Sequence, residues 1–181
     1  CLQQNGRFME RFVSKDIVLR ELEVSDALAL LGAVEYSRVN LSKYMPWEKS
    51  IVDLTSAQSY IEKRVNSGDD GSEWFAIYFK NQFGGVFGIK SIDFDSKACE
   101  LGYWLSDNAR GNRVIGQVLD VVIPYLLDDH GVRVVEFHCL ESNSASVKIV
   151  ERAGATLKRK ICNTLDVPNK EQLMCIYALE V

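Results

Sequence analysis

Histidine, proline and paired cysteines are scarce in this sequence. Its 181 residues include two histidines, three prolines and five cysteines, and no Cys-x-x-Cys pair occurs. Because the cysteine count is odd and the spacing does not suit a structural zinc site, we expect neither a disulfide framework nor a bound metal. The sequence therefore predicts reduced thiols and a cytoplasmic location.

Long apolar runs and an excess of positive charge are also missing. No stretch approaches the roughly 18 apolar residues that a membrane helix requires. The net charge is −4, which argues against general affinity for nucleic acid and weakly favours cationic partners such as amines. We therefore expect no membrane partner and no nucleic-acid partner.

Several nucleotide and nucleophile motifs are absent. The sequence contains no G-x-x-x-x-G-K-S/T loop, no G-x-G-x-x-G turn after a first strand and no G-x-S-x-G elbow. These absences argue against P-loop enzymes, dinucleotide-binding folds and α/β-hydrolases.

The length predicts one folded unit, because chains usually split only beyond about 250–300 residues. Residues 1–12 lack an apolar signal core, and we expect them to form a flexible lead-in. The remaining residues, 13–181, are expected to form one domain.

Apolar periodicity predicts two helices early in the chain, after a short strand around residues 17–20. Apolar residues from 27 to 34 recur at helical spacing, with Ser25 as the expected N-cap. A second helix is expected to begin after a cap at Asp53 and to stop at Gly68.

The rest of the chain alternates between sheet and helix patterns. Strands are expected at 74–80, 83–92, 98–105, 132–139, 156–161 and 172–179, and helices from about 110 to 129 and from 143 to 153. A helical crossover normally makes its two flanking strands parallel neighbours, here 98–105 and 132–139. The sequence predicts a mixed α/β fold with a mostly antiparallel sheet and helices on both faces.

The most informative segment is the junction between the strand at 100–105 and the helix that follows. The chain there reads from Arg110 through Gly111 to Gly116, with a second arginine at Arg113. Free amides at a helix start form an anion site, and a pyrophosphate would suit it. The alternative is an ordinary strand–turn–helix with solvated arginines.

This junction resembles the acyl-CoA-binding motif of the GNAT superfamily of acetyltransferases. The branch that it resembles most acetylates the N-terminal serine or alanine of ribosomal proteins, and its strand typically reads Glu-Ile-Gly-Tyr-Trp-Leu. The similarity runs from about Val13 to Leu179. The segments that carry it are Leu19 to Ala27, Gly85 to Ile89, Glu100 to Leu105, Arg110 to Gly116, and Asn143 to Ala155.

The resemblance implies an N-acetyltransferase that uses acetyl-CoA. A bulge in the strand ending at Leu105 would splay the parallel pair, so that the pantetheine arm could pair with exposed backbone there. Arg113 stands where the family motif has a glycine, and Ile115 stands at its second small position. A catalytically impaired CoA-binding or interaction module is therefore an alternative. The implied cofactor-binding residues are Trp104, Leu105, Arg110, Gly111, Asn112, Arg113, Val114, Ile115, Gly116 and Asn143. Of these, Asn143 is also expected to cap the helix that follows it.

Proton transfer requires an acid and a base. Many family members place a tyrosine at the position of Val150, so Ser146, where the branch carries a serine, becomes the candidate acid. Ser146 could equally be a helix-start serine that bonds its own backbone. Tyr177 is a second candidate acid or a core residue. Glu100 is the candidate base, or a structural carboxylate at a sheet edge.

The acceptor is expected to be a primary amine. Tyr44 and Trp47 lie where the branch builds its acceptor wall, and they could instead be loop packing. The branch resemblance favours a protein or peptide N-terminus, with a polyamine, amino sugar or amino acid as the alternative. A metal site at His138 and Cys139 is disfavoured, because neighbours on a strand face opposite ways. The protein is expected to be a monomer or a homodimer.

Overall fold

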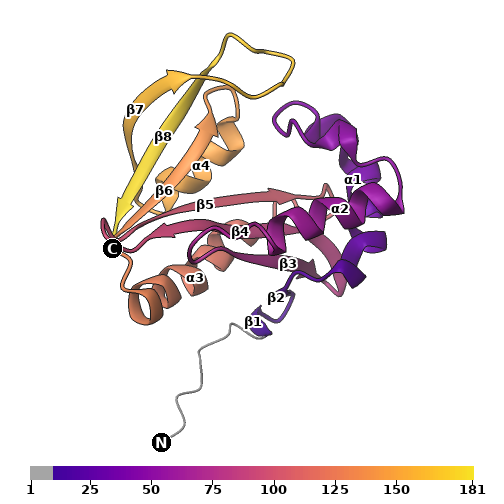
Figure 1. Ribbon diagram of the computed structural model, residues 1–181, viewed down its shortest axis with the longest axis horizontal. Coiled ribbons are helices and arrows are strands. Elements are labelled where there is room, and N and C mark those ends of the chain that lie inside the picture. Colours follow the sequence, from indigo (N-terminus) through magenta and orange to yellow (C-terminus); the bar gives the residue numbers. More distant parts are fainter. Residues whose placement is uncertain (1–9) are drawn as a thin grey trace, which may run out of the picture.

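Eight strands form one sheet in the computed structural model, which describes residues 10–181 (Figure 1). The strands are β1 (Arg11–Ser14), β2 (Ile17–Glu21), β3 (Glu73–Phe79), β4 (Gln82–Asp93), β5 (Ala98–Leu105), β6 (Val134–Leu140), β7 (Thr156–Cys162) and β8 (Leu173–Glu180). Their order across the sheet is β1-β2-β3-β4-β5-β6-β8-β7. Only β5 and β6 run parallel among these neighbours. The predicted mixed, mostly antiparallel sheet is confirmed, with the expected strands as the parallel pair.

The expected lead-in falls mainly on residues outside the described part of the chain. Residues 1–9 lie outside it, whereas Arg11 and Phe12 belong to β1, which pairs with β2. The sequence pattern did not indicate β1, because four residues are too few to establish a period of two.

Helices cover both faces of the sheet, as predicted. They are α1 (Ala27–Leu41), α2 (Leu54–Val65), α3 (Val114–His130) and α4 (Ser144–Arg152), with 3-10 turns at Val24–Asp26 and Glu48–Ser50. None of the helices between residues 10 and 181 is long and apolar enough to cross a membrane.

Two buried cores, one on each face, hold these helices. Leu30 of α1 and Ile61 of α2 pack with Val86 on one face of the sheet. On the other face, Val118 of α3 and Val150 of α4 pack with other sheet residues. Successive strand residues point to opposite faces, so each strand contributes to both cores.

The helix ends show which local signals were reliable. Asp53 caps α2 as predicted, and its side chain accepts a hydrogen bond from the Ser56 amide at 2.7 Å. The expected cap at Ser25 is wrong, because α1 begins only at Ala27. The buried Asp26 side chain determines this turn, since it bonds Arg20 at 2.6 Å.

The strands β5 and β6 separate before they end, which opens the sheet. Their pairing covers only Ala98–Leu101 of β5 and Val134–Phe137 of β6. Beyond this point the two strands diverge, so that β6, β8, β7 and α4 form one arm and the rest of the sheet the other (Figure 1).

The bulge lies on a different strand from the one predicted. The register between β4 and β5 shifts between Ile89 and Ser91, so Lys90 of β4 is the extra residue. We expected the bulge in the strand that ends at Leu105, which is β5, but β5 contributes no extra residue to its pairing with β4. An extra residue bends its strand and increases local twist, so a bulge in β4 can still turn β5 away from β6.

Candidate active site

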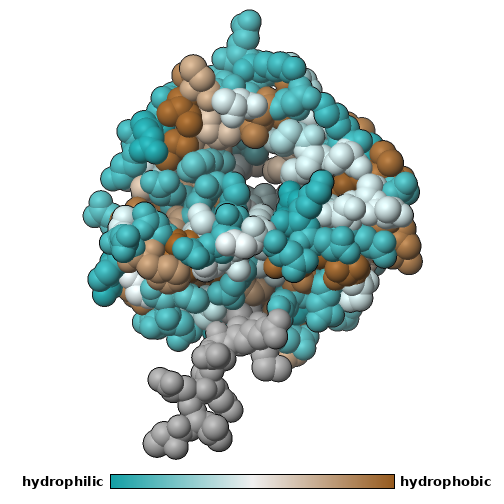
Figure 2. All heavy atoms as spheres, viewed as in Figure 1, coloured by the Kyte–Doolittle hydropathy of each residue, from teal (hydrophilic) through white to brown (hydrophobic). Residues whose placement is uncertain are grey.

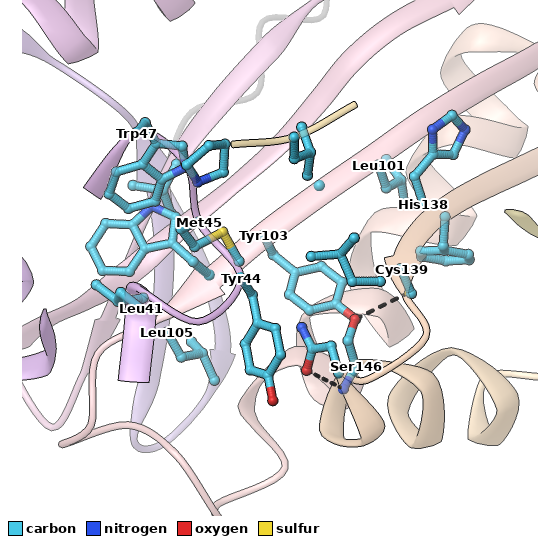
Figure 3. A pocket seen from close by; sticks show the side chains of 18 of the residues that line it. Leu41, Tyr44, Met45, Trp47, Leu101, Tyr103, Leu105, His138, Cys139 and Ser146 are labelled. Carbon is cyan, nitrogen blue, oxygen red and sulfur yellow. Dashed lines mark hydrogen bonds between the residues drawn. The ribbon is translucent and has the colours of Figure 1, made fainter. Parts of the chain in front are cut away.

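A cavity of about 540 Å³ lies in the opening between β5 and β6. Its walls come from the segment between α1 and α2, from the ends of β5 and β6, and from the starts of α3 and α4. Figure 2 shows the molecule hollowed between its two arms, and Figure 3 shows side chains from both arms pointing into the space. The site is therefore built where the sheet loses its continuous pairing.

The cavity passes from one face of the sheet to the other. Leu101, Tyr103 and Leu105 pack with the core beneath α3 and α4, whereas Trp104 packs with the core beneath α1 and α2. Glu100 lies four residues before Trp104 in the strand, so both side chains point to the same face of the sheet. All five residues line the cavity. Two reactants could therefore meet here from opposite faces.

The α3 side presents an exposed loop at a helix start. Helical bonding in α3 begins with the Gln117 amide, which donates to Arg113, so the amides of Val114, Ile115 and Gly116 have no partner within the helix. A Cβ added at Gly111 or at Gly116 would meet no atom within 4 Å, so the space beside both is open. This arrangement fits a diphosphate, which accepts hydrogen bonds from such amides.

Arginine side chains adjoin this loop. Arg110 lines the cavity, and its Nε lies 3.2 Å from the Asp107 carboxylate. Arg113 is exposed and adopts a left-handed backbone with φ 53°. Glycine adopts that conformation freely, so the sequence departs from the family pattern where the backbone favours glycine. Asn112 keeps the turn in place, since its side chain donates to the Arg110 carbonyl at 2.8 Å. The helix itself begins at Val114, later than the predicted start at Arg110 and Gly111.

Ser146 lies at the centre of the α3 and α4 side (Figure 3). Its Oγ is 2.9 Å from the Tyr103 hydroxyl and 3.3 Å from the Cys139 sulfur. Asn143 accepts the Ser146 amide at 3.3 Å and so caps α4 as predicted. Burial raises the pKa of the Tyr103 hydroxyl and of the Cys139 thiol, so both groups stay protonated at neutral pH.

Tyr103 was not among the residues indicated by the sequence. The residue lies inside the segment from Glu100 to Leu105, and the alternation of the strand places it opposite Trp104. No local signal indicates that Ser146, 43 residues later, faces it.

Tyr177 lies away from this centre. It pairs with Phe137 between β8 and β6, is 5% exposed and does not line the cavity. Its hydroxyl donates to the Glu151 carboxylate at 3.4 Å. This placement agrees with the core alternative rather than with a reacting group.

Glu100 lies in a small cluster of charged groups. Lys90 forms an ion pair with it, and His138 Nδ1 lies 3.6 Å from its Oε1. The other nitrogen of His138, Nε2, is 3.5 Å from a Glu136 carboxylate oxygen. The parallel register explains the grouping, because Glu100 and Glu136 are direct partners across β5 and β6. Residues 10–181 contain no group of three or more histidine, cysteine or acidic residues that could hold a metal ion.

The opposite side of the cavity is aromatic. The Trp47 ring is 4.9 Å from Tyr60 and 5.3 Å from Trp104, between ring centroids. Trp104 also donates from Nε1 to the Tyr60 hydroxyl at 2.9 Å. Tyr44 lines the same cavity, and its hydroxyl donates to the Ser142 carbonyl at 3.4 Å. Sequence reasoning indicated Tyr44 and Trp47 here, but not Tyr60.

Comparisons with known proteins show which protein family the chain belongs to. Residues 16–156 match the acetyltransferase (GNAT) domain family, so the chain belongs to that family. It is an N-acetyltransferase that uses acetyl-CoA, and the resemblance read from the sequence is confirmed.

Three individual acetyltransferases are similar to this chain in sequence or in structure. The chain is 21% identical over 147 residues to the ribosomal-protein-serine acetyltransferase of Escherichia coli (strain K12), covering 81% of this chain and 82% of that one. A solved ribosomal L7/L12 alpha-N-protein acetyltransferase in complex with coenzyme A superposes with a TM-score of 0.86 at 20% identity, covering 95% and 98% of the two chains. The microcin C7 self-immunity acetyltransferase, in complex with acetyl-CoA and AMP, gives 0.83 at 22% identity, covering 93% and 94%.

Proposed function

We propose that this protein transfers an acetyl group from acetyl-CoA to the N-terminal amine of a protein or peptide. The observation that carries the proposal is the cavity that crosses the sheet between β5 and β6. It lets a thioester approach from the α3 and α4 face while an amine approaches from the α1 and α2 face. Relatives named for ribosomal-protein acetylation support the choice of acceptor.

The cosubstrate site is proposed along the α3 side. Bound there, acetyl-CoA supplies an activated acetyl thioester. The amides from Arg110 to Gly116 and the Arg110 side chain would hold the diphosphate. The backbone of Trp104 and Leu105 lies past the last pair with β6, so this edge of β5 can accept an added strand-like partner. Asn143 lines the other side of the same gap.

Glu100 is the proposed base. An attacking amine must be neutral, and a carboxylate within hydrogen-bond reach, directly or through one water, can accept its proton. His138 lies between Glu100 and Glu136, so it offers a route for that proton toward the Glu136 side chain.

Ser146 is the proposed acid, and Tyr103 supports it. The Ser146 Oγ can give its proton to the departing thiolate, the Tyr103 hydroxyl at 2.9 Å can replace that proton, and Tyr103 then regains one from water. Burial raises the pKa of Tyr103, so the hydroxyl carries its proton at neutral pH. We assign no reacting role to Tyr177, because its side chain lies outside the cavity.

Tyr44 and Trp47 are the proposed acceptor wall. A terminal α-amine titrates at about 7.7–8.0, whereas a lysine side chain titrates near 10.4. More of the α-amine is therefore neutral at physiological pH, and a single carboxylate base suffices for it. We also place the reaction in the cytoplasm, since the described cysteines Cys99, Cys139, Cys162 and Cys175 are free thiols.

The test uses peptides that begin with serine or alanine and contain one internal lysine. The enzyme is incubated with acetyl-CoA and each peptide, and mass spectrometry locates the acetyl group. We expect acetylation of the N-terminus. Acetylation chiefly of the lysine, or only of polyamines supplied in competition, would contradict the proposal. Binding of acetyl-CoA without turnover on any amine would favour the impaired-module alternative.

A further inference from the structure

We propose that the acceptor carries an anionic group, a carboxylate or a phosphate, in addition to its amine, and that Arg64 binds this group. The inference deepens the proposed function, because it names a property of the acceptor at the same site. It rests on the position, partners and charge of one side chain in the wall of the cavity.

Aromatic rings hold Arg64 in place. It lies in the last turn of α2 and lines the cavity. Its guanidinium carbon is 3.4 Å from the centroid of the Tyr60 ring, 5.3 Å from that of Trp74 and 5.9 Å from that of Trp47. Its Nη1 donates to the Tyr60 carbonyl at 3.2 Å. Stacking of this kind orients a guanidinium fork before a ligand arrives.

The charge of Arg64 is uncompensated within the described part of the chain. The other charged side chains that line the cavity have partners: Lys90 with Glu100, Arg110 with Asp107, and His138 with two carboxylates. Between residues 10 and 181, no carboxylate forms an ion pair with Arg64, and its buried Nε has no hydrogen-bond partner. A half-buried cation without a counter-ion is incompletely solvated, so an anion from outside the chain would be bound favourably.

Burial strengthens this argument. It lowers the pKa of the Arg64 guanidinium from its ordinary value, because part of the group is removed from water. The group is nevertheless always protonated at neutral pH. A carboxylate or phosphate in this half-buried, aromatic site would form bidentate, charge-assisted hydrogen bonds.

The location assigns the anion to the acceptor rather than to the cosubstrate. Arg64 belongs to α2, which packs on the same face as Trp104 and Glu100, the acceptor face. The loop proposed to bind the diphosphate precedes α3, whose core covers the other face. An anionic side chain a few residues after the peptide N-terminus, or the carboxylate of an amino acid, could reach Arg64 while the amine lies at Glu100.

The first experiment compares matched acceptors with the wild-type enzyme. Alanine-starting hexapeptides carry glutamate, glutamine or phosphoserine at position 2, 3 or 4, and kcat/KM is measured from thiol release. We expect glutamate or phosphoserine to be preferred over glutamine by about tenfold or more at one of these positions. The stronger of the two identifies carboxylate or phosphate as the group recognised. Equal rates with all three peptides at every position would overturn the inference and leave the proposed function standing.

A second arm keeps the inference testable if peptides are not substrates. Lysine and cadaverine both carry a primary amine and differ by a carboxylate. A preference for lysine would support an anionic acceptor even where the peptide proposal fails. Preference for cadaverine, or equal rates, would overturn it.

Substitutions of Arg64 then test whether this residue causes the preference for an anionic acceptor. Arg64→Met should reduce the glutamate-to-glutamine ratio to about one, and Arg64→Lys should retain part of it, because the charge remains but the fork is lost. The matched control is Arg110→Met, on the other face, which should weaken acetyl-CoA binding while the ratio persists. A ratio that survives Arg64→Met would contradict the assignment. The wild-type comparison above does not depend on the folding of any variant.

Discussion

The hydroxyl groups of Ser146 and Tyr103 lie 2.9 Å apart, at the level where β5 and β6 have already separated. One residue comes from the first turn of α4 and the other from the end of β5, so the pair bridges the two arms of the sheet. Cys139 lies 3.3 Å from the same serine oxygen. Three proton-carrying groups thus meet at one wall of the gap in which we place the thioester.

Ser146→Ala should lower kcat by about 10- to 100-fold, because one proton donor of two is removed. The dissociation constant of acetyl-CoA should change little, since the serine acts mainly during the reaction. Steady-state kinetics and calorimetry measure the two quantities. Ser144→Ala, an exposed neighbour in the same helix turn, is the control. A variant with full kcat would transfer the donor role to Tyr103 or to water.

Glu100→Gln should reduce kcat/KM for a peptide amine by about 100-fold near pH 7. The loss should shrink above pH 8, because the α-amine, with a pKa of about 7.7–8.0, is then neutral without a base. A pH profile of kcat/KM checks this, with the exposed Glu62→Gln as control. A loss that is equal at all pH values would indicate a structural role for Glu100 instead.

Arg110→Glu should weaken acetyl-CoA binding by more than about tenfold, because it places a negative charge beside the proposed diphosphate site. The new charge would also lie next to Asp107, the present partner of Arg110. Calorimetry gives the dissociation constant. Lys63→Glu, an exposed charge reversal on the other face, should not change it. Equal binding by wild type and Arg110→Glu would place the diphosphate elsewhere.

Arg113→Gly should raise the free energy of unfolding by about 0.5–1 kcal/mol. A left-handed residue other than glycine costs roughly 1–2 kcal/mol, and the greater freedom of glycine in the unfolded chain offsets part of the gain. Urea unfolding measures the change. Gly111→Ala is the reverse substitution at a second left-handed position, where φ is 76°. It should lower the free energy of unfolding by about 1 kcal/mol. Destabilisation by Arg113→Gly would show that the arginine side chain makes compensating contacts.

Acidification should loosen the contact between two segments beside the cavity, residues 44–50 and 163–170. Hydrogen bonds from Lys170 and Lys49 lower the pKa of Asp166 to about 2, and the Lys49 bond joins the segment before α2 to the segment before β8. Because the folded pKa lies below the unfolded value, this contribution is present above about pH 4 and is lost as the pH falls toward 2. The pair is exposed, so salt should weaken it.

Hydrogen exchange of residues 44–50 and 163–170 between pH 5 and pH 2.5, corrected for intrinsic rates, follows this loosening. Asp166→Asn should show the loosened state already at pH 5. Equal protection in the variant and the wild type would mean that the bond does not hold the two segments together.

Much of the fold could be predicted because its signals are local. The strand alternation around 98–105, the cap at Asp53 and the cap at Asn143 each depend on neighbours within a few residues. The parallel pairing of β5 and β6 could also be predicted from the sequence, because a helical crossover between two strands has only one favourable geometry. Ser25 failed as a cap because the Asp26 side chain holds that turn, with Arg20 nearby and the distant Tyr78 as its partners.

The sequence by itself determined the family, the order of elements and the loop from Arg110 to Gly116, because spacing along the chain is what defines them. Only the tertiary structure decided which strand carries the bulge, that Tyr103 faces Ser146, and that Arg64 has no acidic partner in the described part of the chain. A period of two tells which face a side chain occupies, but not what stands opposite it. That depends on the packing of segments tens of residues apart, which no local propensity encodes.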